Sequence, residues 1–281
     1  MHGLEELADF NPVLKGEVYR NSKTKIFTDG TTNTICSRTA IFKDKDIHSE
    51  YMENKLYYAP IEIRKNKNNN KMDSGEPRND SIKRAKDQIF DLVLNNEFEY
   101  FFTGTINPEQ MNSKDPAEVI KPVQQWLKDM VKRYGLHYIM IAEYHKKGGI
   151  HFHGLLMSDK PLKMEYSGTK LYKGYKKPVS DEKAEKKGLY EGREVYNLKT
   201  WSFGYTTCIK LQGDRLNTAF YVTKYITKDC KKIFGRFFWH SQNLKKPKII
   251  IQDIDFDSIQ SYEVKGFKYE FKRGEQGNAT K

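Results

Sequence analysis

A run of tyrosines and lysines has the residue types and spacing of a nucleophilic site. Tyr221-Val-Thr-Lys224-Tyr225-Ile-Thr-Lys228 repeats the pattern Y-[VI]-T-K back to back. At about 100° per residue, these two tyrosines and two lysines share one arc of a helix. A phenol with a pKa of about 10 is a poor nucleophile until cations stabilise its phenolate, which adjacent lysines do. The opposite arc would face a sheet and holds Ala219, Phe220, Thr223, Ile226, Thr227 and Cys230.

A second cluster has the residue types of a metal site. His151 and His153 alternate in the predicted strand 150–157, which follows the predicted strand 136–144 across a basic, glycine-containing turn. With that turn centred near Lys147, Glu143 lies directly across from His151, and alternation places Glu143 and both histidines on one face. Two imidazoles and a carboxylate suit a divalent cation that polarises a phosphoryl oxygen. A histidine in a strand is more often a packing or surface residue, so the matching position of Glu143 carries this interpretation.

The elements that position these residues follow from hydrophobic periodicity. We expect helices over 81–96, with Ser81 as the N-cap, over 116–134, with Asp115 as the N-cap and Gly135 as the stop, and over 217–232. Further strands are expected over 97–106, 200–211 and 235–240. Because strands and helices do not alternate strictly, the sequence predicts an α+β fold, an antiparallel, five-stranded-type sheet with helices packed on one face.

Composition bounds the protein class. The chain has 281 residues, a formal net charge of +12 and 13% aromatic residues, with a sequence pI near 9.3. This charge favours a polyanionic partner, most often nucleic acid. Three cysteines without a CxxC pair indicate neither a disulfide framework nor a cysteine zinc site. No apolar run has the length of a membrane span, and a reducing cytosolic setting is the default expectation.

The texture of the chain suggests three parts. Residues 1–80 form a basic N-terminal extension of open role that includes a polar tract over 65–80, and 242–281 form a C-terminal extension with a polar tail. The dense periodic signals fall in 81–241, which we expect to be the catalytic domain. Within it, 158–197 is rich in lysine, glycine and tyrosine and has the composition of an insertion or long loop.

Three segments, taken in order, resemble the motifs of the HUH endonucleases, and more narrowly the replication initiators of rolling-circle plasmids and single-stranded DNA phages. They are the aromatic, threonine-rich strand end Phe101-Phe-Thr-Gly-Thr-Ile-Asn-Pro108, the pair His151-Phe-His153 with Glu143 upstream, and the doubled Tyr-x-x-Lys run that begins at Tyr221. The resemblance covers about 81–241 and implies an HUH-type, ferredoxin-like sandwich. Each motif is loose alone, and the ordered set is more specific.

The resemblance also implies a mechanism. A divalent metal, Mg²⁺ or Mn²⁺, on Glu143, His151 and His153 would polarise the scissile phosphate of single-stranded DNA. Tyr221, with Tyr225 as the second tyrosine, would attack it, forming a 5′-phosphotyrosyl link and freeing a 3′-OH primer. Lys224 and Lys228 would orient the phosphate and lower the phenol pKa. DNA contacts are expected from Thr103, Thr105, Asn107, Lys146 and Lys147.

The implied partners follow from this role: single-stranded DNA at a replication origin, and a host DNA polymerase. No GxxxxGK[ST] motif occurs in the sequence, so a separate host helicase or supercoiling is expected to open the strands. The expected location is the cytoplasm of a bacterial host, without membrane association.

Two other functions fit the same residues. An HUH transposase or a mobilisation protein would keep the fold and the chemistry, although the best-known mobilisation relaxases place the tyrosine near the N-terminus and use three histidines. A non-catalytic α+β module that binds single-stranded DNA or RNA would use the histidines structurally and the tyrosines for stacking. Only the enzymes form a covalent protein–DNA adduct.

Overall fold

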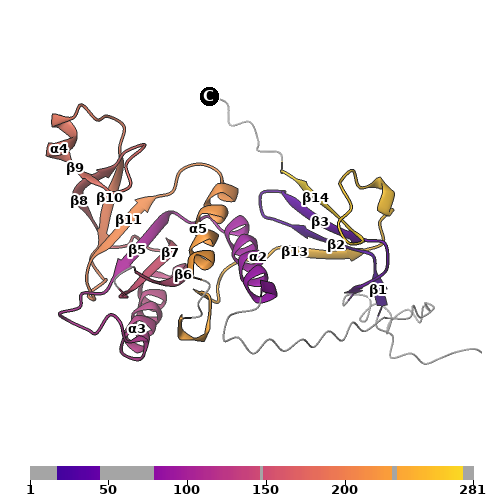
Figure 1. Cartoon of the computed structure of the whole chain (residues 1–281), viewed down its shortest axis with the longest axis horizontal. Helices are drawn as coiled ribbons and strands as arrows, with labels where there is room; N and C mark the ends of the chain where they lie inside the picture. Colours follow the sequence, from indigo (N-terminus) through magenta and orange to yellow (C-terminus); the bar gives the residue numbers. More distant parts are fainter. Residues whose placement is uncertain (1–17, 45–78, 146–147, 230–232, 275–281) are drawn as a thin grey trace, which may run out of the picture. The chain divides into compact units, whose positions relative to one another are not determined.

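The computed structural model describes residues 18–44, 79–145, 148–229 and 233–274, with side chains in the fourth described helix given as far as Tyr225. The described residues fall into two compact units, one over 79–246 and the other built from 18–44 together with 247–274 (Figure 1). No helix in these described ranges is long and apolar enough to cross a membrane.

The larger unit is an α+β domain built on one antiparallel sheet, as the sequence predicts. Its eight strands have the order β12-β6-β7-β5-β11-β10-β8-β9 (Figure 1). The five predicted strands are all present in that sheet: β5 (Tyr100–Thr105), β6 (Leu136–Tyr144), β7 (Ile150–Ser158), β11 (Thr206–Lys210) and β12 (Trp239–His240).

Helices cover both faces of this sheet, so the expectation of a single covered face is wrong. Helix α3 (Pro116–Tyr134) packs on the face that carries Phe152, whereas α2 (Asn79–Asn95) and α5 (Arg215–Asp229) pack on the face that carries Leu155. Successive residues of β7 point to opposite sides, and apolar residues occupy both sides of this strand. The central strands are therefore buried on both faces.

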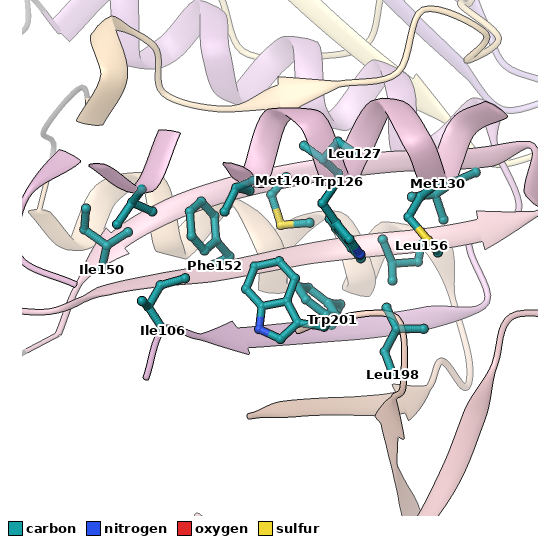
Figure 2. Close-up of a cluster of buried hydrophobic side chains, with 14 of the residues drawn as sticks. Ile106, Trp126, Leu127, Met130, Met140, Ile150, Phe152, Leu156, Leu198 and Trp201 are labelled. Atoms are coloured by element: carbon teal, nitrogen blue, oxygen red, sulfur yellow. The ribbon is translucent and has the colours of Figure 1, made fainter. Parts of the chain in front are cut away.

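The core on the α3 side is built from large side chains (Figure 2). Trp126 of α3 donates its indole N–H to the carbonyl of Thr200 at 2.9 Å, and Trp201 donates to the carbonyl of Thr105 at 3.1 Å. The two indole rings meet edge to face with centroids 4.9 Å apart. Both polar N–H groups are thus satisfied while the rings fill the core, which fixes the end of β5 against the loop that precedes β11.

The ends of α2 and α3 partly match expectation. Asp115 caps α3 as predicted, since its Oδ1 accepts from the Ala117 N–H at 2.8 Å, and Gly135 ends the helix in the left-handed region at φ 62°. Glu118 does not complete a capping box with Asp115, because its carboxylate accepts from the N–H of Asn112 instead. Ser81 is not an N-cap either, since α2 already begins at Asn79.

The stretch 158–197 is not a long loop. It forms β8 (Met164–Leu171), β9 (Val179–Ser180), the short helix α4 (Asp181–Lys186) and β10 (Arg193–Leu198), which extend the sheet beyond β11. Its lysines and glycines hide the strand pattern in the sequence. Strands at the margin of a sheet tolerate such composition because lysine discourages edge-to-edge pairing.

The smaller unit joins residues from the two ends of the described chain. A hairpin of β2 (Ser22–Ile26) and β3 (Thr32–Ser37) lies between β13 (Lys248–Gln252) and β14 (Phe267–Lys272) in a four-stranded antiparallel sheet. β1 (Val18–Arg20) pairs with β4 (Phe42–Asp44) separately. The sequence analysis treats the two terminal stretches as separate extensions, and their pairing is visible only in the structure.

One glycine in the middle of β7 should be intolerant of substitution. A Cβ on Gly154 would lie 2.4 Å from the carbonyl oxygen of Ile139 on the neighbouring strand. We expect Gly154→Ala to lower the free energy of unfolding by about 1–3 kcal/mol, measured by urea denaturation, because backbone must move to relieve the overlap. Gly188→Ala is the control: no atom lies within 4 Å of its added Cβ, so only its left-handed backbone, at φ 59°, is strained. An equal loss in both variants would contradict this explanation.

Candidate functional site

The histidine motif and the tyrosine motif meet on one face of the large sheet. β6 and β7 pair with Glu143 opposite His151, which confirms the predicted register. Helix α5 packs on this same face, and the ring of Tyr225 stacks on that of His153 with centroids 4.1 Å apart and an angle of 20° between the rings. Residues separated by about 70 positions in the chain are therefore in direct contact.

The two tyrosines of α5 are in unequal environments. Their hydroxyl oxygens lie 3.0 Å apart, within hydrogen-bonding distance. Tyr221 is 43% exposed, and the ammonium of Lys224 lies 3.7 Å from the centroid of its ring. Tyr225 is less exposed, and burial, followed by the hydrogen bond and charge of Tyr221 and the charge of Glu143, raises its pKa well above the ordinary value. Tyr221 is thus the tyrosine that solvent and a substrate reach more easily.

His153 is held at both ring nitrogens. Its Nε2 lies 3.2 Å from Oε2 of Glu143, and its Nδ1 lies 3.2 Å from the hydroxyl oxygen of Thr103 on β5. Glu143 is only 4% exposed. A buried carboxylate needs a charged or hydrogen-bonding partner, and His153 provides one. This chain of contacts fixes the orientation of the His153 imidazole.

The three predicted metal ligands share a face, but in this structure they are not gathered round one point. Glu143 contacts His153, while the ring of His151 stacks on His145 with centroids 4.7 Å apart. Among the described residues, no group of three histidine, cysteine, aspartate or glutamate side chains is arranged to hold a metal ion. In chemical type the donor set still fits a divalent cation, because it combines two imidazoles with a buried carboxylate on adjacent strands.

Two of the predicted DNA contacts have structural roles. The hydroxyl of Thr105 donates to the carbonyl of Tyr205 at 2.9 Å and accepts from the N–H of the same residue at 3.1 Å. The Asn107 side chain accepts from the N–H of Glu109, and its own N–H donates to the carbonyl of Phe203. Thr105 and Asn107 therefore fix the loops after β5 and before β11.

Other expected site residues lie outside the described part. Lys146, Lys147 and Cys230 are in undescribed segments, and the side chains of Ile226, Thr227 and Lys228 are not described. On the arc expected to face the sheet, Ala219 and Thr223 are buried, whereas Phe220 is 58% exposed and contacts Phe90 of α2 edge to face. The correction for Phe220 is physical: it lies at the border of the buried arc, where α2 rather than the sheet is its neighbour.

The sequence analysis missed two aromatic residues of the site. Phe101 contacts the rings of Tyr221, Tyr225 and His153, with centroid distances of 5.0, 5.9 and 6.2 Å. His145 stacks on His151. Strand alternation offers a signal for Phe101, which lies two residues before Thr103 and thus on the same face. His145 follows directly after β6, where alternation no longer applies.

The contact between Thr103 and His153 gives a test of positioning. We expect Thr103→Val to reduce the affinity for Mn²⁺, measured by calorimetric titration, by about 10–100-fold, because an unheld imidazole loses its orientation. Thr207→Val is the matched control, since Thr207 lies directly across from Thr103 on β11. Similar thermal unfolding of the two variants would separate positioning from stability, and unchanged Mn²⁺ affinity in Thr103→Val would contradict the role.

Comparison with known proteins agrees with this arrangement. Residues 99–230 match the model of a family described as Replication-associated protein ORF2. No curated protein and no solved structure gives a significant match to the chain. The matched range begins just before β5 and ends just after α5, so it includes both the sheet that carries the histidines and the helix that carries the tyrosines. This segment of the chain belongs to the replication-associated protein ORF2 family.

Proposed function

We propose that this protein is a rolling-circle replication initiator that cleaves and rejoins single-stranded DNA at an origin through a phosphotyrosine intermediate. The observation that supports this best is the contact of the Tyr225 ring with His153, which brings the tyrosine pair to the sheet face that carries the histidines and the buried carboxylate. The membership of this segment in a replication-associated family supports the biological setting.

Tyr221 is the proposed nucleophile. Its phenol loses a proton to solvent, and the resulting oxygen attacks the phosphorus of a single-stranded DNA linkage. A bond forms between this oxygen and phosphorus, the bond from phosphorus to the 3′ oxygen breaks, and the 3′ oxygen takes up a proton. One phosphodiester replaces another, so the reverse attack by a 3′-hydroxyl reseals the strand without a nucleotide cofactor. Lys224, whose ammonium lies 3.7 Å from the Tyr221 ring centroid, stabilises the phenolate.

The neighbouring residues have supporting roles in this proposal. Glu143, His151 and His153 would hold a divalent cation, Mg²⁺ or Mn²⁺, which supplies Lewis-acid polarisation of a phosphoryl oxygen. Tyr225 orients Tyr221 through the contact between the two hydroxyl groups and serves as the second tyrosine in strand transfer. Lys228 would contact the phosphate. A host polymerase extends the freed 3′-hydroxyl, and a host helicase opens the duplex.

The test is a covalent adduct. Full-length protein is incubated with labelled single-stranded origin DNA and Mn²⁺ and then separated on a denaturing gel. We expect a shifted band that disappears with EDTA and is insensitive to heat. A transposase or mobilisation protein would form adducts preferentially on element ends or a transfer origin, which the choice of DNA distinguishes. Strong binding of single-stranded DNA with no adduct on any of these DNAs would support the non-catalytic module instead.

A further inference from the structure

The four-stranded sheet of the smaller unit has two faces of different chemistry. The strand register assigns every side chain to a face, because residues directly opposite each other point to the same side. We call one side the aromatic face; the register groups on it the side chains of Lys23, Lys25, Asn33, Ile35, Ser37, Ile249, Ile251, Phe267, Tyr269 and Phe271.

The opposite face is the packed side of this sheet. Cys36 and Ser22 lie on it and are completely buried. Cys36 clusters with Phe256 and Ile259 from the segment between β13 and β14. Lys268 of β14 also points to this side, where its ammonium donates to the carbonyl of Phe256 at 3.1 Å and lies over the Phe256 ring. The small core of the unit is therefore on the side away from the aromatic face.

β14 carries the reverse of the usual pattern. A strand with one solvated face normally points apolar residues to the core and polar residues outward. In β14 the charged residues Lys268, Glu270 and Lys272 take the packed side, while Tyr269 and Phe271 on the outer side are each 44% exposed. Burial in the core of this unit does not account for these rings. A local rule broken in this way is a common mark of a functional surface.

The rings form a row along an edge strand. Alternate residues of a strand are separated by about 6.8 Å along its axis, and the Phe267 and Tyr269 ring centroids are 6.4 Å apart. Ile249, on the other edge strand of the same sheet, is 43% exposed. The aromatic face thus offers successive flat apolar surfaces to a ligand that runs along β14.

The charge on this face has one sign. Lys23 and Lys25 lie on the central strand β2, between the row of rings and Ile249. Among the residues of the four strands the only carboxylate belongs to Glu270, which is on the packed side with Lys272 at 2.9 Å. An apolar protein partner would have to cover both lysines. A strand of unpaired bases would place its phosphates by the lysines and its bases on the rings.

We propose that the aromatic face is a second nucleic-acid site, which binds single-stranded DNA without sequence preference. This inference goes beyond the cleavage chemistry, because none of its residues belongs to the site on the large sheet. It gives the protein a place to hold unpaired DNA that does not depend on the presence of a scissile linkage.

The test measures binding of a labelled oligothymidylate to the full-length chain by fluorescence anisotropy. Tyr269→Leu/Phe271→Leu keeps apolar side chains on the strand and removes the rings. We expect it to weaken binding at least about ten-fold, since each lost base–ring stack has an effect of this size. The control is Tyr262→Leu in the same unit, where the tyrosine is 95% exposed and lies outside the four strands. Unaltered binding in the double variant would overturn the proposal.

Two further measurements locate the site. Lys23→Gln/Lys25→Gln should weaken binding and reduce the dependence of log K on log salt by about 1 per lysine. The charge-matched control, Lys248→Gln/Lys272→Gln, changes residues on the packed side and should have a smaller effect on binding. Ultraviolet crosslinking of an iodouracil-substituted oligonucleotide should label the peptide that contains Phe267, Tyr269 and Phe271. Crosslinks confined to 79–246, or stronger binding of oligouridylate RNA than of DNA, would refute a DNA site on this face.

The fates of the two proposals are separable. Tyr269→Leu/Phe271→Leu should still form the covalent adduct at saturating origin DNA, because its substitutions lie in the other unit. Tyr221→Phe should retain binding of oligothymidylate while losing the adduct. Loss of the adduct in the Tyr269/Phe271 variant at saturation, with unchanged oligothymidylate affinity, would instead mean that these rings serve cleavage.

Discussion

Tyr221→Phe is expected to lower the rate of covalent adduct formation at least about 10³-fold, a loss typical of removing the atom that attacks. The hydroxyl is the only difference between the two side chains, and it is the group that would become bonded to phosphorus. Tyr221 is the more accessible of the two tyrosines and lies beside the ammonium of Lys224. Single-turnover kinetics on a denaturing gel measures the effect.

Tyr225→Phe is the matched control for that experiment. It keeps the ring that stacks on His153 and removes only the hydroxyl 3.0 Å from that of Tyr221. We expect a loss of about ten-fold, the scale for one hydrogen bond, with adduct still formed on Tyr221 and detectable by peptide mapping. If Tyr225→Phe abolishes the adduct while Tyr221→Phe retains it, the roles of the two tyrosines are exchanged.

Glu143→Gln is expected to lower metal-dependent cleavage by about 10²–10³-fold, in line with the several kcal/mol that a bound cation contributes to such reactions. Glutamine has nearly the same shape but lacks the negative charge. Glu143 is buried beside His153, so no water-exposed carboxylate can substitute for it at that place. Adduct formation with Mn²⁺ and calorimetric titration of Mn²⁺ should decline together.

Metal removal and a charge control complete this prediction. EDTA should reduce cleavage by the wild-type protein to the level of Glu143→Gln and have little effect on that variant. Glu182→Gln removes one negative charge from the exposed helix α4 and should leave both cleavage and Mn²⁺ affinity unchanged. Equal Mn²⁺ affinity in wild type and Glu143→Gln would show that the carboxylate is not a ligand.

The local part of the fold could be predicted from residue patterns. The register of β6 against β7 followed from alternation and a short turn, because a hairpin leaves few ways to pair its strands. Asp115, Pro116 and Gly135 marked the ends of α3, because capping depends on neighbouring residues. The predictions were wrong where long-range packing decides. Both faces of the sheet are covered, and 158–197 adds strands that its lysine-rich composition concealed.

The sequence by itself determined which side chains share a strand face or a helix arc, since the periods of 2.0 and 3.6 residues are local properties of the backbone. It thus grouped His151 with His153, and Tyr221 with Tyr225. Only the tertiary structure decided that the tyrosine arc lies against the histidine face, because the docking of α5 depends on the packing of residues such as Ala219 and Val222 against distant strands. The same reason explains why β14 and the hairpin of β2 and β3 had no predicted partner.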